Sequence, residues 1–285
     1  MPINIQFFVF VFYVLSVVES IAVFGLKLPF VKGCDFIPLQ MKLRFALLQR
    51  VVMGCSNLSA ADPIEKQITV EGINYFEVVV EPKSVRVLWS DAAGNAFRKF
   101  EAVQTYLEAK GDTTRMLMNG GIFEPGGIPS GLLVQDGKES HPLNRNAGRG
   151  NFFLKPNGVF YISKGKAGVK ETEEYFNASP KPDFAVQSGP MLLKDGKIHP
   201  AFTADSTNRL HRNGVGVRKD GKVLFLITPW KTDKRPNLFE FASAFRKKDC
   251  ENALFLDGDI SQMVLNPKTQ ALPDGYFGSF IAVIE

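Results

Sequence analysis

Apolar runs separated by short polar turns dominate the sequence from residue 75 onward, a pattern typical of β-hairpins. Residues 75–80 and 85–90 predict two paired strands joined through Glu81-Pro-Lys. Asn-Gly and Asp-Gly pairs favour type I′ turns, because both central residues of such a turn need positive φ. Four of these pairs lie between apolar runs and predict hairpins: Asp136-Gly137, Asn157-Gly158, Asp195-Gly196 and Asp220-Gly221.

Two segments carry the apolar spacing of amphipathic helices. Residues 237–248 place four apolar side chains on one face, and Asn237 can cap the start of that helix. A shorter helix is expected over residues 101–110, a buried strand over 253–256 and a closing strand over 280–284. These elements predict an α+β (mixed α/β) fold, with hairpin-rich mixed sheets and flanking helices in a single domain.

An approximate repeat connects two of the hairpins. Residues 130–142 resemble residues 188–200, because both begin with Ser-Gly, contain an Asp-Gly turn and end with His-Pro. A polar loop and then a second hairpin follow in each copy. A duplicated double-hairpin unit would place two equivalent loops at related positions on a sheet. The loops are residues 143–150 and 201–213, and the second hairpins are expected over residues 151–162 and 214–227.

The first sixty or so residues differ from this pattern. Residues 5–26 are almost continuously apolar, over about the length that crosses a bilayer. A second start at Met41 has the layout of a secretory signal, and Val52-Met-Gly-Cys55 resembles a lipoprotein cleavage box with Cys55 as the lipidated residue. We therefore expect residues 1–62 to be a leader, either a membrane anchor or a signal segment with a mis-assigned start. Residues 63–285 would form the folded domain of an exported protein, periplasmic or anchored to the membrane through the N-terminal segment alone.

Composition and charge argue against several classes of function. The chain has 285 residues, a formal net charge of +5 and scattered basic residues, so we expect no nucleic-acid partner. The sequence has no glycine loop followed by Lys and Ser or Thr, which argues against an NTP site. Two of the three cysteines lie in the leader, so neither a disulfide framework nor a zinc site is expected. Cys250 is expected to be a partly buried free thiol.

Four segments carry polar side chains that core packing does not require. In the first, Asn119 and Glu124 lie in a glycine-rich turn after an apolar run. Glycine permits positive φ and close approach of a ligand, as we expect at Gly120 and Gly121. Because loops at strand ends can converge on one edge of a sheet, these segments predict one site. The other three segments are residues 187–190, 208–213 and 256–261.

Each segment also has a simpler interpretation. Asp257-Gly258 is a common turn, and Arg209 and Arg212 can be solvated or paired with acids. The three histidines show no metal-ligand spacing. Ser188-Gly189 lacks the flanking pattern of a serine-hydrolase elbow.

Together the four segments resemble the phosphodiester glycosidase domain family. This family includes the lysosomal "uncovering enzyme", N-acetylglucosamine-1-phosphodiester alpha-N-acetylglucosaminidase, and the chain looks most similar to its exported bacterial members. The resemblance covers residues 75–285 and implies a mixed α/β domain with the motifs lining a cleft. The motifs are Asn119-Gly-Gly-Ile-Phe, Ser188-Gly-Pro, Arg212-Asn-Gly-Val-Gly-Val and Leu256-Asp-Gly-Asp-Ile-Ser.

The resemblance implies hydrolysis of sugar-1-phosphodiesters in exported or envelope glycans, with no cofactor. Such a reaction needs a carboxylate as nucleophile or base, a role we assign to Asp257, with Glu124 and Asn119 as further catalytic candidates. Arginine side chains and backbone N–H groups suit the phosphate. The residues assigned to phosphate or substrate binding are Arg212, Arg209, His211, Ser188, Gly189, Gly120 and Gly121.

Two departures from the family pattern leave other interpretations open. Arg212-Asn213 stands where the family has Arg-Thr, and Asp259 stands where it has a small residue. The added charge and bulk of Asp259 favour a non-catalytic glycan-binding protein of the cell envelope that keeps the cleft. A third interpretation is a divalent cation held by Asp257, Asp259 and Glu124 through oxygen ligands.

Overall fold

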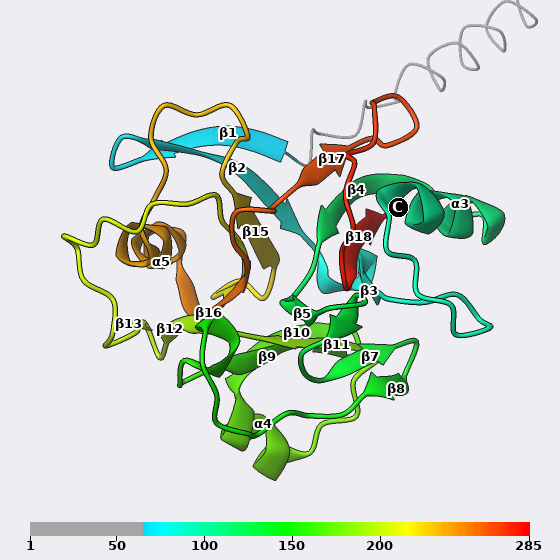
Figure 1. The fold of residues 1–285 in the computed structure, drawn as a ribbon, viewed down its shortest axis with the longest axis horizontal. Helices are drawn as coiled ribbons and strands as arrows, with labels where there is room; N and C mark the ends of the chain where they lie inside the picture. The colour runs from blue at the N-terminus through cyan, green and yellow to red at the C-terminus, as the bar shows by residue number, and fades with distance from the viewer. Residues whose placement is uncertain (1–64) are drawn as a thin grey trace, which may run out of the picture. The chain divides into compact units, whose positions relative to one another are not determined.

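Antiparallel sheets make up most of the computed structural model, which describes residues 65–285 (Figure 1). The predicted leader lies outside the described residues. The largest sheet has seven strands in the order β1-β2-β15-β14-β16-β12-β13. Its strands are β1 (Glu65–Val70), β2 (Ile73–Val80), β12 (Met191–Lys194), β13 (Lys197–Ile198), β14 (Asn213–Arg218), β15 (Val223–Ile227) and β16 (Cys250–Asp257).

Two further sheets and one short ribbon contain the other strands. A five-stranded sheet has the order β10-β9-β11-β7-β8, and a four-stranded sheet has the order β17-β4-β18-β3. The five-stranded sheet consists of β7 (Leu133–Gln135), β8 (Lys138–His141), β9 (Gly158–Ser163), β10 (Lys166–Glu171) and β11 (Phe184–Ser188). The four-stranded sheet consists of β3 (Val85–Leu88), β4 (Thr114–Asn119), β17 (Met263–Leu265) and β18 (Phe280–Ile284), and the ribbon of β5 (Phe123–Glu124) and β6 (Ile128–Pro129).

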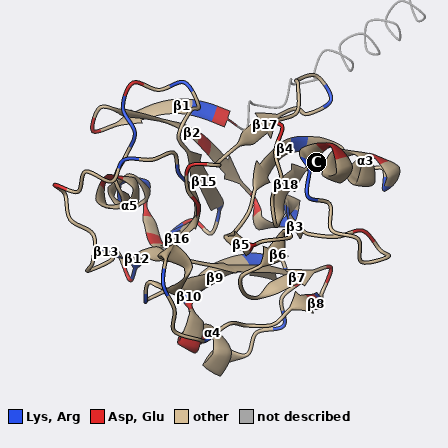
Figure 2. Cartoon of the chain, in the orientation of Figure 1, with Lys and Arg blue, Asp and Glu red and all other residues tan. Residues whose placement is uncertain are grey.

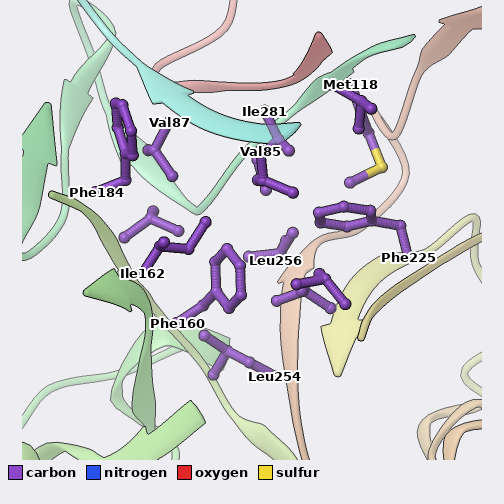
Figure 3. Packing of buried hydrophobic residues seen from close by; sticks show 14 of the residues in the cluster. Val85, Val87, Met118, Phe160, Ile162, Phe184, Phe225, Leu254, Leu256 and Ile281 are labelled. Carbon is purple, nitrogen blue, oxygen red and sulfur yellow. The ribbon is translucent and has the colours of Figure 1, made fainter. Parts of the chain in front are cut away.

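The inner faces of the three sheets meet in one central core. Val85 and Val87 from β3, Phe160 from β9 and Leu254 and Leu256 from β16 point toward one another there (Figure 3). Side chains of a strand alternate between its two faces, so each sheet also has an outer apolar face that needs a cover. One helix covers each: α5 (Leu238–Lys247) the seven-stranded sheet, α3 (Phe100–Ala109) the four-stranded sheet and α4 (Thr172–Ala178) the five-stranded sheet (Figure 1).

The predicted α+β class is correct, but the sheets are not mixed. Every pairing among the described strands is antiparallel. Six of the fourteen pairings join consecutive strands through short turns, which connect only antiparallel pairs, whereas parallel pairs need long crossovers. The fold is therefore a hairpin-rich assembly with three helices in its described part.

Helix length, more than capping, explains which helices the sequence reveals. In α5 the Asn237 side chain accepts the N–H of Glu240 at 2.9 Å, and the Glu240 carboxylate accepts the N–H of Asn237 at 3.0 Å. This capping box agrees with the predicted start. The predicted helix over 101–110 corresponds to α3. The seven-residue α4, which begins after the cap Glu171, was not predicted because two turns are too short for a clear helical period.

Three of the four predicted turns form, and one does not. Asp136-Gly137 and Asp195-Gly196 both have positive φ, and Asp220-Gly221 closes the β14–β15 hairpin. Asn157-Gly158 is not a turn, because Asn157 is fully buried and its amide donates to Phe152 O while accepting the hydroxyl of Thr172. Tertiary hydrogen bonds thus override the local preference of that pair.

The predicted pairing of residues 75–80 with 85–90 is wrong. β2 and β3 lie in different sheets, and the short 3-10 helix η1 (Pro82–Ser84) carries the chain from one to the other. β2 pairs instead with β1 through Glu71-Gly72, whose positive φ values of 52° and 74° fit a tight turn. A second 3-10 helix, η2 (Asn151–Phe153), occupies part of the predicted hairpin 151–162; β9 pairs with β10 through Lys164-Gly165.

The internal repeat is larger than the sequence suggests. The first copy, residues 133–188, contains two hairpins, then α4, then β11, which inserts between the hairpins in the order β10-β9-β11-β7-β8. The second copy, residues 191–257, contains two hairpins, then α5, then β16, inserted likewise in the order β15-β14-β16-β12-β13. The two equivalent loops exist as predicted, but they belong to two sheets rather than one.

Surface charge, helix length and cysteine placement add three observations. Basic and acidic residues are interspersed over the described chain (Figure 2). None of the described helices has the length and apolar character needed to cross a membrane. Cys250 is a buried free thiol, and burial raises its pKa to about 12.

Candidate active site

The ends of β4, β14 and β16 bring three polar side chains into one network. Asn119 Nδ2 donates to Asp257 Oδ2 over 3.0 Å. Asn119 Oδ1 accepts the N–H of Gln262 at 2.8 Å and Nδ2 of Asn213 at 3.2 Å. Because these two donors occupy the carbonyl oxygen, the amide orientation is determined and its NH₂ group faces the carboxylate. Asn119 therefore holds Asp257 in position rather than acting as an acid or base itself.

The Asp257 carboxylate accepts few hydrogen bonds for a side chain with so little contact with solvent. Its Oδ1 accepts the N–H of Gly258 at 2.7 Å, and Asn119 supplies the only other hydrogen bond to it among residues 65–285. Burial raises the pKa of Asp257 to about 6, against the opposing effect of these two hydrogen bonds. A carboxyl that titrates near neutral pH in a partly exposed position suits a general base or nucleophile.

A β-bulge places Asp257 at the end of its strand. Asn213 pairs with Asp257 and Gly214 pairs with Phe255, so Leu256 is an extra residue in β16. Bulges bend a strand and redirect the side chains beside them. The carbonyl of Leu256, which lacks a partner in the sheet, accepts the hydroxyl of Ser188 at 3.0 Å.

Ser188 and Gly189 lie inside the protein, contrary to the predicted substrate contacts. Ser188 is fully buried, and its Oγ also accepts the N–H of Ile122 at 3.4 Å. A Cβ on Gly189 would lie 2.7 Å from Phe152 O and from Asn157 Cβ. Ser188 thus ties β11 to β16 and to the glycine-rich turn, and Gly189 allows close packing within the first copy.

Gly120 and Gly121 also approach protein rather than an open site. Their N–H groups donate to Ser279, to its backbone oxygen at 2.8 Å and its hydroxyl at 3.1 Å. Neither glycine has positive φ; that conformation occurs at Gly126 and Gly127. The prediction of ligand-binding N–H groups at 120 and 121 is therefore replaced by a structural role.

The acidic residues of the predicted site do not gather around Asp257. Glu124 is exposed and accepts the hydroxyl of Ser130 at 2.8 Å. Asp259 is exposed, accepts the N–H of His211 at 3.0 Å and lies 3.9 Å from Arg235. Within residues 65–285, no three His, Cys, Asp or Glu side chains are close enough to hold a metal ion. The metal site considered from the sequence is therefore not formed.

Arg209 and His211 already have partners of their own. Arg209 binds the Glu240 carboxylate through two nitrogens, at 2.6 and 3.0 Å, and donates to Arg235 O at 3.0 Å. The His211 ring is buried and stacks on Trp230, with centroids 4.5 Å apart. Burial lowers the pKa of His211, so the ring is neutral at pH 7 and supports Trp230 rather than presenting a charge.

Arg212 is directed away from the Asp257 network. Asn213 reaches Asn119, whereas the neighbouring Arg212 projects from the other face of the sheet and lies over the Phe255 ring at 5.7 Å. Its Nε donates to Pro236 O at 3.1 Å. The sequence segments converge, but this arginine and the carboxylate do not share one cleft.

An open pocket of about 450 Å³ borders the network on the outside. Ser261, whose hydroxyl donates to Asp257 O at 3.2 Å, and Gln262 form part of its wall. Trp230, 61% exposed, forms another part, and Asp257 is not among the residues that line this pocket. This volume is in the range of small-molecule sites. The other lining residues are Phe76, Ile227, Thr228, Met263, Ala271, Pro273 and Asp274.

Comparison with known families agrees with this arrangement. The sequence profile of the phosphodiester glycosidase family matches residues 112–278, more than half of the chain. The chain belongs to the phosphodiester glycosidase family. The stretch matched to this phosphodiester glycosidase profile includes both copies of the repeat and the network of Asn119, Asn213 and Asp257.

Two individual proteins are similar to this chain, one in sequence and one in fold. The uncharacterized protein YigE of Escherichia coli (strain K12) is 34% identical over 245 residues, which cover 85% of this chain and 91% of that protein. The catalytic domain of zebrafish N-acetylglucosamine-1-phosphodiester alpha-N-acetylglucosaminidase, auto-inhibited by its pro-peptide, matches with a TM-score of 0.53 and 20% identity. The match covers 79% of this chain and 85% of that one, and it shows a shared fold.

Three residues of the site were not predicted. Asn213 lies in the predicted polar segment 208–213 and was noted as a departure from the family pattern, but no role was assigned to it; its buried amide joins β14 to Asn119. Gln262 contributes its backbone N–H, which any residue except proline supplies, so no side-chain pattern reveals it. Trp230 follows a buried strand, and an isolated exposed aromatic residue was the only available signal.

Proposed function

We propose that the protein hydrolyses sugar-1-phosphodiesters, with Asp257 as the reacting carboxylate. The observation that carries this proposal is the Asn119–Asp257 pair, a positioned carboxyl of raised pKa, in a member of the phosphodiester glycosidase family. A carboxylate is what an oxocarbenium-like transition state needs, whether it attacks the anomeric carbon or removes a proton from water.

The bond that breaks joins the anomeric carbon to a phosphate oxygen. The bonding electron pair leaves with that oxygen, which departs as a phosphate monoester, and water supplies the new oxygen of the free sugar. The proton from water passes to Asp257 and then to solvent. A phosphate monoester is a good leaving group, so the reaction has little need of a second carboxylic acid, in keeping with the position of Glu124 outside the network.

The pocket beside the network supports a sugar as the bound group. The face of Trp230, held by the His211 ring, offers a flat apolar surface for one side of a sugar ring. Gln262 and Asp274 line the same pocket and supply polar groups for hydroxyls, whereas the hydroxyls of Thr228 and Ser261 are bonded to backbone oxygens of the fold. Envelope or exported glycans are the proposed source of substrate, and the signal-like residues 41–61 of the sequence support export.

Cleavage in water labelled with ¹⁸O tests the reaction directly. Incubation with an alkyl N-acetylglucosamine-1-phosphate diester should place the label on the anomeric hydroxyl of the released sugar. Label in the phosphate monoester would mean phosphorus–oxygen cleavage and would contradict the proposed chemistry.

A non-catalytic glycan-binding role is the second candidate, because the exposed Trp230 suits binding as well as catalysis. Asp257→Asn and Trp230→Ala separate the two. An enzyme loses turnover in the Asp257 variant while still binding sugar. A binding protein shows no turnover in the parent and loses affinity only in the Trp230 variant.

A further inference from the structure

A second, smaller cavity lies beside Arg212 at the start of α5. It has a volume of about 110 Å³. The Asp257 network occupies the other face of β14, so the two sites are separate. The residues lining the cavity are Leu154, Ala201, Phe202, Thr203, Ser206, Asn208, Arg212, Leu238 and Phe239.

Arg212 is a buried cation that has no counter-ion in the described part of the chain. The residue is 1% exposed, and a guanidinium carries five N–H donors. Nε donates to Pro236 O and Nη2 donates to Asn208 O at 2.9 Å, so both partners are neutral carbonyls. Nη1 has no hydrogen-bond partner among residues 65–285. A buried charge in this state is costly unless an anion joins it.

The acids near Arg212 are already engaged elsewhere. The Glu240 carboxylate binds both nitrogens of Arg209 and the N–H of Asn237. Asp259 is exposed and accepts the N–H of His211. Neither carboxylate forms an ion pair with Arg212, so the charge of the cavity wall remains positive.

The start of α5 adds further donors to the same cavity. Asn237 caps the helix by accepting the N–H of Glu240 through its side chain and the N–H of Phe241 through its backbone oxygen. Leu238 and Phe239 occupy the first two positions, whose N–H groups have no acceptor within a helix, and both line the cavity. The positive end of the helix dipole lies there as well.

The first copy of the repeat provides an internal comparison. Gly158 pairs with Ser188 as Asn213 pairs with Asp257, so Asn157 is the counterpart of Arg212. Asn157 is neutral, and both ends of its amide have partners, Phe152 O and Thr172 Oγ1, each at 2.8 Å. The second copy carries a charge with an unused donor where the first carries a satisfied amide. Folding of the unit therefore does not require a cation at this position.

We propose that the cavity binds a small tetrahedral oxyanion, such as phosphate, between Nη1 of Arg212 and the first N–H groups of α5. The hydroxyls of Thr203 and Ser206 add donors at the rim. The inference does not depend on the reaction proposed for Asp257, because it concerns a site on the other face of the sheet.

Binding of inorganic phosphate to the full chain is the test. At constant ionic strength, phosphate at ~100 times Kd should raise the Tm saturably by about 5–10 °C, whereas matched sodium chloride should not. Calorimetry should show one phosphate per chain. Absence of a saturable shift and of binding heat would overturn the proposal. A sugar-1-phosphate tested in parallel identifies the source: tighter binding than phosphate indicates an ester headgroup, and weaker binding indicates the free ion.

Thr203→Glu and its matched control Thr203→Gln locate the site. Thr203 is exposed and uses only its backbone oxygen in the fold, so neither change should unfold the protein. The new carboxylate should occupy the place of the anion, raise the Tm without phosphate and weaken phosphate binding at least ~10-fold. The glutamine variant should bind within about threefold of the parent. Equal behaviour of the two variants would contradict the assigned cavity.

Asp257→Asn keeps this test independent of catalysis. Phosphate should still raise the Tm of that variant as it does in the parent. If the phosphate response disappears with Asp257, the anion binds at the active site, and the separate cavity is refuted.

Discussion

The two copies of the repeat share strand order and helix position but differ at the end of their central strands. In the first copy, β11 pairs with β9 without interruption and ends at Ser188, whose hydroxyl donates a hydrogen bond to the Leu256 carbonyl inside the protein. In the second copy, a bulge interrupts β16, which ends at a carboxyl of raised pKa. The comparison teaches that one scaffold can be closed, with its last side chain bonded into the fold, or can end in a carboxyl of raised pKa, depending on one inserted residue and one side chain.

The closed first copy supports the end of the second copy that carries Asp257. The bulge leaves the Leu256 carbonyl without a sheet partner, and Ser188 of the first copy supplies the missing donor. Proteins commonly tolerate unfavourable groups at functional sites when the surrounding structure compensates them. Here the compensation comes from the equivalent position of the other copy.

The largest effect is expected from Asp257→Asn. This change removes the charge but keeps the shape, so kcat/KM for a sugar-1-phosphodiester should fall about 10³-fold or more. Glu124→Gln is the matched removal of a carboxylate outside the network and should change kcat/KM by less than about threefold. Equal rates for parent and Asp257→Asn would mean that the two copies do not differ in chemistry at all.

The pH dependence of stability should also distinguish the copies. Because the folded-state pKa of Asp257, about 6, lies above its ordinary value of 3.8, the folded protein binds this proton more tightly than the unfolded chain does. The contribution of Asp257 to stability is therefore highest below about pH 4, falls as the pH rises to about 6 and is lowest above that. Between pH 4 and pH 7, the stability of Asp257→Asn relative to the parent should rise by at most about 3 kcal/mol. Denaturant unfolding of both proteins at several pH values measures the difference; a difference that does not change with pH would contradict the raised pKa of Asp257.

Asn119→Ala should misplace the carboxyl without removing it. The expected loss in kcat/KM is about 10- to 100-fold. Because the Asn119 amide holds the pKa of Asp257 down, its removal should also move the acidic limb of the pH–rate profile upward. An unchanged limb alongside a reduced rate would show that Asn119 serves only the fold.

Ser188→Ala tests the support from the closed copy and has the smallest expected effect. It leaves the buried Leu256 carbonyl and the N–H of Ile122 without partners, at a cost of about 1–3 kcal/mol in unfolding free energy. Ser163→Ala, which removes an exposed hydroxyl bonded to Lys181 O, is the control and should cost less than about 0.5 kcal/mol. Urea unfolding of the two variants measures both values, and similar losses would mean that the bulge needs no support.

Local signals predicted much of the scaffold. The capping box at Asn237 and Glu240 acts within one turn of helix, and Asp136-Gly137 acts within one turn of chain, so neither needs tertiary information. The same reasoning failed at Asn157, where Phe152 and Thr172 satisfy the amide in the buried interior. Hairpin propensity is a weak preference that buried hydrogen bonds can override.

The sequence predicted which segments form the site, but not how their side chains are oriented. Residue types and order brought out Asn119, Asp257 and Ser188, and the structure does bring their segments together. Arg212 and Asn213 are adjacent and point to opposite faces, but the sequence did not show which of the two would face Asp257. Glycines suggest close approach, but sequence does not say to what, and at Gly120 the neighbour is Ser279.

The order in which the chain contributes its strands has a consequence for folding. Asn119 and Asp257 are 138 residues apart, and β4 pairs along its length with β18, which ends at Ile284. Contacts that span so much chain form slowly, because the loop must be closed before they can stabilise anything. Asp257 therefore meets Asn119 only after nearly the whole chain is available. A chain still emerging from the ribosome would therefore carry every hairpin of the first copy before the carboxyl of Asp257 is in place.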